Sequence, residues 1–173
     1  MLTTLILTAI GPDRSGLVRA LSTAIAENGG NWLESRMCRL GGQFAGILRV
    51  EVPAEKADAL AAGLGKLEEV GLNVEILRDD VAAVAQTGTR ATLDTVGQDQ
   101  PGILRRVTGV LAARGLNIED ITSERTEAPM SGGALFRIRA LLTVPASASL
   151  EEVRADLEAI APDLMVELKP SLI

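Results

Sequence analysis

The chain contains the same motif twice. Residues 11–18 read GPDRSGLV, and residues 97–104, which lie 86 positions later, read GQDQPGIL. The same offset relates GGNW at 29–32 to GLNI at 115–118. A repeat of this length is a duplicated domain rather than a short solenoid unit. The duplication predicts two similar domains, at about 1–80 and 88–173, joined by a linker at about 79–88.

Hydrophobic periodicity gives each copy the order strand, helix, strand, strand, helix, strand. In the first copy we expect strands over 3–10, 31–40, 43–52 and 72–78, and helices over 15–28 and 54–70. In the second copy the strands fall over 90–97, 117–126, 134–144 and 163–169, and the helices over 101–114 and 147–161.

This order is the ferredoxin-like βαββαβ arrangement of the α+β class, in which two helices cover one face of a four-stranded antiparallel sheet. A single copy leaves the other sheet face and the sheet edges open. We therefore expect the two domains to pair within the chain, and the chains to form a homodimer or tetramer. Pro53 matches Pro145 at an offset of 92, so six extra residues fall in the second copy's hairpin at 125–133, whose role the sequence leaves open.

Composition excludes several functions. The net charge is −6 and the pI about 4.8, and aromatic residues make up only 2%, so direct binding to nucleic acid is not expected. The chain has no His and a single cysteine, Cys38, which excludes a Cys/His zinc site, a Ser-His-Asp triad and an intrachain disulfide. We expect no cofactor and a cytoplasmic protein. The apolar stretch 2–10 is too short for a membrane span and lacks a basic leader.

The sharpest motif is the turn between the first strand and the first helix of each copy. In the second copy we expect Pro101 and Gly102 in the first helical turn, where Pro costs no hydrogen bond and Gly lets a ligand approach the backbone. The free N–H groups of a helix start attract a carboxylate. Asp99 could accept from an ammonium group, and we expect the amide of Asn117 at the same edge of the sheet. A carboxylate and an ammonium group one carbon apart define an α-amino acid.

Both the strand order and the pattern G-x-D-x-P-G-[IL]-L followed by G-x-N-[IW] resemble the ACT domain, a small-molecule regulatory module that typically occurs in pairs. The match is close in the second copy, whereas the first has Ser15 in place of the proline. Two ACT-like domains without any further domain are most similar to the glycine cleavage system transcriptional repressor family. This resemblance implies an amino-acid-responsive regulator that acts through a transcription factor or enzyme partner, with glycine or serine as its ligand.

The resemblance also implies the ligand-binding positions, because ACT domains bind amino acids at domain interfaces through this turn and the Asn that opens the second strand. In the second copy they are Asp99, Gln100, Gly102, Ile103, Leu104, Asn117 and Ile118; in the first they are Asp13, Arg14, Ser15, Gly16, Leu17, Asn31 and Trp32. Because Pro101 pre-organises the turn, we expect the second copy to form the stronger site.

Structural alternatives stand beside these assignments. The turn residues could serve only to start the helix, and the two asparagines only to begin a strand. For Trp32 a core or interface role outweighs stacking on a ligand. Phe44 and Phe136 occupy the third strands, where RNA-recognition modules stack bases, but the alternation of each strand places both rings under the helices.

Three other functions compete with a ligand-binding regulator. A ligand-free assembly module needs no further chemistry. An enzyme is disfavoured, because the chain has no His, no Tyr and no visible pair of nucleophile and base. A nucleic-acid binder is opposed by the acidic charge. We therefore predict a non-enzymatic regulator.

Overall fold

The computed structural model describes residues 1–78, 87–127 and 133–171. It divides the chain into two compact units, unit 1 (Met1–Val84) and unit 2 (Ala85–Ile173). Most of the expected linker at 79–88 and of the hairpin at 125–133 lies outside the described residues.

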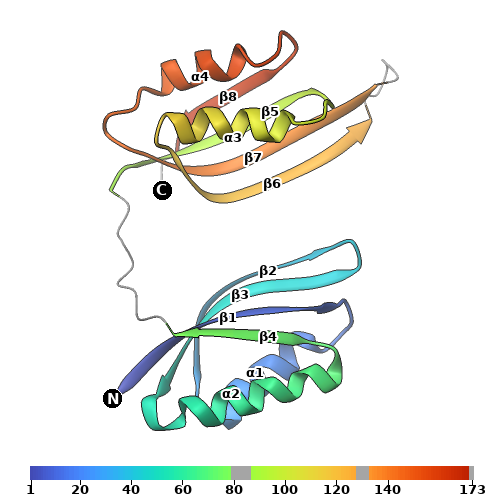
Figure 1. Ribbon diagram of the computed structural model, residues 1–173, viewed down its shortest axis with the longest axis vertical. Coiled ribbons are helices and arrows are strands. Elements are labelled where there is room, and N and C mark those ends of the chain that lie inside the picture. The colour runs from blue at the N-terminus through green and yellow to red at the C-terminus, as the bar shows by residue number, and fades with distance from the viewer. Residues whose placement is uncertain (79–86, 128–132, 172–173) are drawn as a thin grey trace. The chain divides into compact units, whose positions relative to one another are not determined.

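Unit 1 is a four-stranded antiparallel sheet with two helices on one face (Figure 1). Its strands run in the spatial order β2-β3-β1-β4, so β2 and β4 form the edges. The second helix is extended at both ends by short 3-10 turns. The elements are β1 (Leu2–Pro12), α1 (Leu17–Glu27), β2 (Asn31–Leu40), β3 (Gln43–Pro53), α2 (Ala57–Gly65) and β4 (Asn73–Arg78).

Unit 2 repeats this arrangement, with the strand order β6-β7-β5-β8 and β6 at one edge. Its elements are β5 (Thr89–Gln98), α3 (Ile103–Ala113), β6 (Asn117–Glu127), β7 (Ala134–Val144), α4 (Leu150–Glu158) and β8 (Met165–Pro170). The two sheets and their helices confirm the predicted pair of ferredoxin-like domains.

Each unit has its own hydrophobic core between the sheet and the helices. Strand residues alternate, so that in β1 Leu5, Leu7 and Ala9 are buried under the helices. Phe44 and Phe136 are half-buried and pack against the core of their own unit, which confirms the core interpretation of both rings. Trp32 also packs against the core of unit 1.

The starts of α1 and α3 differ from the prediction. Gly16 and Gly102 are not in the first helical turn but precede it as N-cap residues, with φ of 92° and 83°. Pro101 therefore lies in the turn before the helix rather than in its first turn. A positive φ is easily adopted only by glycine, so the backbone conformation of the turn accounts for this residue type in both copies.

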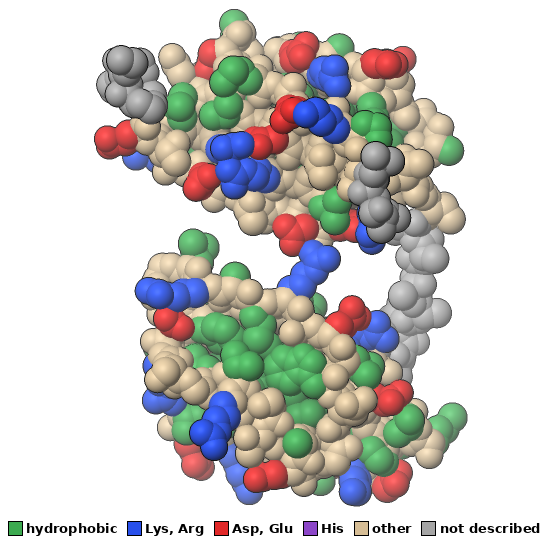
Figure 2. All heavy atoms as spheres, turned by 180° about the vertical axis from the view of Figure 1, so that it is seen from behind, with side chains coloured by type: hydrophobic (Ala, Val, Ile, Leu, Met, Phe, Trp, Pro, Cys, Tyr) green, Lys and Arg blue, Asp and Glu red, His purple; other side chains and the backbone are tan. Residues whose placement is uncertain are grey.

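The surfaces of the two units also differ. On the side of the molecule seen in Figure 2, hydrophobic side chains gather on the unit that carries the N-terminus. On the other unit, acidic and basic side chains stand next to one another.

Candidate functional site

The N-termini of α1 and α3 lack the usual stabilising groups. Neither N-cap glycine offers a side-chain hydrogen bond, and neither helix has an acidic residue in its first turn. In contrast, the Ser149 hydroxyl accepts a hydrogen bond from the Glu152 N–H at 3.4 Å at the start of α4, whose first turn holds two glutamates. A helix N-terminus carries a partial positive charge and favours an anion. The partial positive charge at the starts of α1 and α3 is therefore not offset by a side-chain cap or by an acidic residue of the first turn.

An exposed arginine increases this positive charge in both units. Arg19 and Arg105 are the third residues of α1 and α3, and they match at the repeat offset of 86. A cation at this end of a helix is disfavoured by the helix dipole. The same arginine therefore adds to the positive charge of the helix start in both copies.

The aspartate of the turn forms the same two contacts in both units. Asp13 pairs with Arg39 at 2.9 Å and Asp99 with Arg125 at 2.8 Å, each through the arginine Nε. In addition, the Asp13 N–H donates to the Gly42 carbonyl at 2.9 Å, and the Asp99 N–H to the Ala134 carbonyl at 2.8 Å. The aspartate thus fastens the turn to the neighbouring hairpin. An ammonium ligand at Asp99 would have to share the carboxylate with Arg125.

The residue after this aspartate connects the turn to the segment that precedes the other edge strand, β4 in unit 1 and β8 in unit 2. In unit 1 the Arg14 guanidinium donates to the Val70 carbonyl. In unit 2 the Gln100 side-chain carbonyl accepts from Arg106 at 2.9 Å, and Arg106 also donates to the Ile160 carbonyl at 3.2 Å. The side chains of Arg14 and Gln100 therefore have structural partners within their own unit.

The end of the strand before the turn, β1 in unit 1 and β5 in unit 2, contacts the segment before the edge strand differently in the two units. In unit 2 the Gln98 N–H donates to the Asp163 carboxylate at 2.6 Å. The corresponding residue of unit 1, Pro12, has no N–H to donate. There the strand instead passes very close to the backbone before β4, because a Cβ on Gly11 would lie 2.2 Å from the Gly71 carbonyl oxygen.

The expected position of the asparagines is wrong. Asn117 pairs with Thr143 on β7, and Thr143 pairs with Arg90 near the beginning of β5, whereas the turn follows the end of β5 at Gln98. Eight strand residues separate the two levels, roughly 26 Å. Asn31 likewise pairs with Glu51, far from the turn of unit 1.

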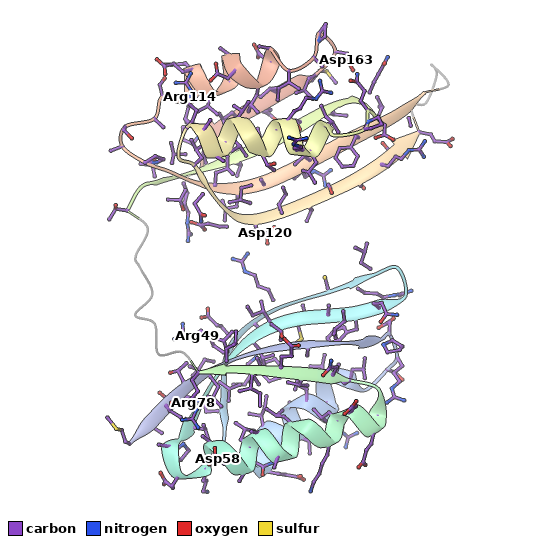
Figure 3. The ribbon with its side chains drawn as sticks, viewed as in Figure 1. Arg49, Asp58, Arg78, Arg114, Asp120 and Asp163 are labelled. Atoms are coloured by element: carbon purple, nitrogen blue, oxygen red, sulfur yellow. The ribbon has the colours of Figure 1, made fainter. Side chains whose placement is uncertain are left out.

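Figure 3 shows the same separation in unit 2. Asp163 lies at the end of the unit where α3 begins, and Arg114, the C-cap residue of α3, lies at the opposite end. The turn and the asparagine of one unit therefore cannot bind the two ends of the same small amino acid.

The hydrophobic candidates divide by exposure. Leu17 and Ile103 are buried and anchor the first helical turn in the core, while Leu104 is exposed. Ile118, like its counterpart Trp32, is half-buried against the core. At the start of α3 the exposed groups include the turn backbone around Gly102 and the side chains of Leu104, Arg105 and Arg106.

A groove extends along α3 beside the edge strand β6. Its volume is about 510 Å³, and its lining includes Arg105 in the first helical turn and Asn117 at the beginning of β6. Gly109 lies on the groove side of the helix, where a Cβ would meet no atom within 4 Å. Such an open surface of helix and strand edge can receive an element of another domain.

Sequence reasoning missed two features that recur in both units, and the first of them could have been found from the repeat offset. Arg39 matches Arg125 at the repeat offset, and each forms the ion pair with the aspartate of its turn. The β-bulges also recur, because the register shifts between Trp32 and Glu34 in β2 and between Ile118 and Asp120 in β6. Comparison of every matched pair of positions, rather than of the motif alone, would have found the arginines.

Residues 1–78, 87–127 and 133–171 contain neither a metal-binding cluster nor a membrane-spanning helix. No group of three or more Cys, Asp or Glu residues there could hold a metal ion. No helix in these ranges is long and apolar enough to cross a membrane.

The turn, the uncapped helix start and the repeated βαββαβ order define the class to which the chain belongs. Residues 3–76 and 91–162 each match the ACT domain family, so the chain is a tandem ACT-domain protein. Among characterised proteins it is similar to the glycine cleavage system transcriptional repressor of Escherichia coli K12, with 24% identity over 92% of this chain and 85% of the repressor.

Solved structures show the same tandem fold. A protein of Galdieria sulphuraria superposes with a TM-score of 0.81 and 27% identity, covering 99% of this chain and 100% of that one. A structure provisionally assigned as a glycine cleavage system transcriptional repressor superposes with a TM-score of 0.72 and 17% identity, covering 99% of each chain.

Proposed function

We propose that this protein is an amino-acid-responsive regulator that binds a small amino acid at the interface of two ACT domains and thereby modulates a partner protein. The observation that carries the proposal is the pair of uncapped helix starts, each with an arginine in its first turn. In each unit the helix start and its arginine form a positive pole of a size that suits one carboxylate.

The separation of the turn from the asparagine supports a site shared between domains. Both β2 and β6 are edge strands that begin with the asparagine and end near the turn of their own unit. Two such edges that pair antiparallel about a two-fold axis bring the beginning of one strand to the end of the other. The turn of one domain then meets the asparagine of its neighbour, and the amino acid contacts both.

Within this arrangement we propose that the turn at 99–104 forms the stronger site. Pro101 restricts the backbone before Gly102, so less freedom is lost on binding. The turn of unit 1, with Ser15 at the matching position, contributes across an interface or contacts the partner protein.

Regulation through a partner, rather than through direct DNA binding, follows from the charge of −6 and the lack of a basic arm in the sequence. The similarity to a transcriptional repressor supports a role in the control of glycine or amino-acid metabolism, and favours regulation over catalysis. Glycine and serine are the first ligands to test. A ligand-free assembly module is the second candidate, since the groove beside α3 could receive another domain without any ligand.

Amide chemical shifts of the isotopically labelled full chain, recorded during a glycine or serine titration, test the proposal. We expect the largest shifts at 102–105 and at the asparagine side chains. Asn117→Ala and Asn31→Ala each remove one exposed amide that has no role in the core, so weaker binding in a folded variant identifies the asparagine that the ligand uses. Shifts confined to residues far from both turns would contradict the site. A DNA gel shift by the purified chain alone would contradict indirect regulation.

A further inference from the structure

The helix-free face of the sheet in unit 1 carries five large aliphatic side chains beside several charged ones, of which Arg49 and Glu34 form an ion pair at 2.7 Å. On β1 every second residue points away from the helices, and along this line Leu2, Ile6 and Ile10 alternate with threonines. Ile47 on β3 and Leu77 on β4 belong to the same face, because they pair with Thr8 and Ile6. Ile6 is half-buried, whereas Ile10, Ile47 and Leu77 are exposed at 52%, 48% and 64%. We call these five residues the apolar sheet face.

The matching face of unit 2 is charged and internally paired. Thr92, Arg139 and Lys169 replace Ile6, Ile47 and Leu77 at the equivalent positions. The Arg137 guanidinium binds the Asp94 carboxylate through two nitrogens, with Nε at 2.8 Å, and Arg139 approaches the same carboxylate at 3.5 Å. These charges are satisfied within the sheet and in contact with water, so this face needs no cover. Unit 2 thus lacks the aliphatic side chains of unit 1 at these three positions, although Val96, Leu141 and Met165 lie on the same face.

We propose that the apolar sheet face of unit 1 is a dimer interface that packs against the same face of a second copy of this chain. A monomeric soluble protein rarely exposes a contiguous patch of large aliphatic side chains. A two-fold contact buries such a patch with itself, and two sheets pack readily face to face with nearly aligned strands.

The area is sufficient for a stable dimer. The strands of unit 1 contain 11, 10, 11 and 6 residues. At about 3.3 Å per residue and about 4.8 Å between strands, one side of the sheet covers roughly 600 Å². Two copies then bury roughly 1,200 Å², the lower limit for specific interfaces.

The charges around the patch are compatible with this contact. A two-fold axis along the strands, between β3 and β1, places β4 of one copy over β2 of the other. Glu75 and Arg36 stand at the same level on these outer strands, since Glu75 pairs with Thr8 and Arg36 with Ile47, so that opposite charges face each other. At the next level Leu77 lies over a depression of about 270 Å³ that is lined by Ile6, Glu34 and Arg49.

Transfer of the unit 2 residues to unit 1 tests the interface with little risk to the fold. The triple variant Ile6→Thr, Ile47→Arg and Leu77→Lys introduces side chains that the equivalent sheet of the same protein carries. We expect sedimentation velocity to show a dimer for the wild-type chain, and at least about 100-fold weaker dimerisation for the variant. The matched control is Met165→Asn, which removes an equally exposed apolar residue, 66% against 64%, from the charged face and leaves the dimer intact.

Cys38, the single cysteine, reports on the geometry directly. It is exposed, and it pairs with Ala45 on the same level as Ile10. In one chain an Asn73→Cys side chain lies three strands away, roughly 14 Å, which is too far for a disulfide. In the proposed dimer each Cys38 lies opposite residue 73 of the second copy.

We therefore expect Asn73→Cys to give a covalent dimer with a short bifunctional thiol reagent, and the wild-type chain to give very little. Efficient cross-linking of the wild-type chain through Cys38 alone would indicate pairing of the β2 edges and overturn the proposal. A wild-type chain that sediments as a monomer at all concentrations would overturn it as well. Amino-acid binding at the turns is measured separately by titration, and pairing of the β2 edges would leave the proposed ligand site intact.

Discussion

The substitution Arg105→Glu is expected to stabilise α3 and, at the same time, to weaken ligand binding. The side chain is exposed and is the third residue of a helix without a cap or an acidic residue in its first turn. The substitution removes a cation that the helix dipole disfavours and adds an anion that it favours. Since each such contact at an exposed position is worth about 0.3–1 kcal/mol, we expect unit 2 to gain about 1 kcal/mol, or about 5 °C in Tm.

The same substitution should weaken amino-acid binding at least about tenfold, because the new carboxylate occupies the position and repels the charge of the ligand carboxylate. Urea unfolding and calorimetric titration of one preparation measure both effects. Arg105→Gln only removes the cation, so its stability and its affinity should both fall between those of the wild-type and the Glu variant. Arg19→Glu is the corresponding substitution in unit 1 and tests the helix start of α1 in the same way. A stabilised Glu variant with unchanged affinity would refute the assignment of the carboxylate to this helix start.

Three further changes test the fold. Thr95→Val should stabilise unit 2 by about 1 kcal/mol in urea unfolding, because the buried Thr95 hydroxyl has no hydrogen-bond partner among the described residues; a loss of stability would show that the hydroxyl is satisfied. Gly11→Ala should cost about 1–3 kcal/mol, because its Cβ would overlap the carbonyl oxygen of Gly71; an unchanged urea midpoint would disprove this close approach. The hydrogen bonds from Arg137 lower the pKa of Asp94, so its contribution to stability is present above about pH 4 and is lost as the pH falls through the lowered pKa. Asp94→Asn should therefore reduce the loss of urea resistance between pH 5 and pH 2, and an unchanged acid profile would exclude Asp94 as a source of it.

The fold could be predicted from the sequence because two independent signals agreed. The 86-residue offset gave the duplication, and the alternation of residues such as Leu5 and Leu7 gave the strands. The helix starts were predicted about two residues too early, because sequence pattern did not reveal that Gly16 and Gly102 take a left-handed conformation before the helix. The β-bulges at Leu33 and Glu119 were not predicted, since a single extra residue barely disturbs the alternation on either side.

The candidate site was predicted in its parts but not in its arrangement. The turn residues followed from their motif, whereas the position of Asn117 depends on topology. An eleven-residue helix carries the chain back along the whole sheet, so the next strand begins at the end opposite to the turn. The partners of the turn aspartates, Arg39 and Arg125, lie 26 residues away in sequence and become neighbours only when the strand register is known.

Calorimetric titration of the full chain with small ligands tests the central claim most directly. Glycine and serine carry both a carboxylate and an ammonium group, whereas acetate and methylamine carry one each and serve as matched controls. The account predicts saturable binding of at least one amino acid, and no comparable binding of acetate or methylamine at the same concentration. Equal binding of acetate would show that the site recognises only an anion and would contradict amino-acid binding. The absence of binding of either amino acid would also contradict the account and would favour a ligand-free assembly module.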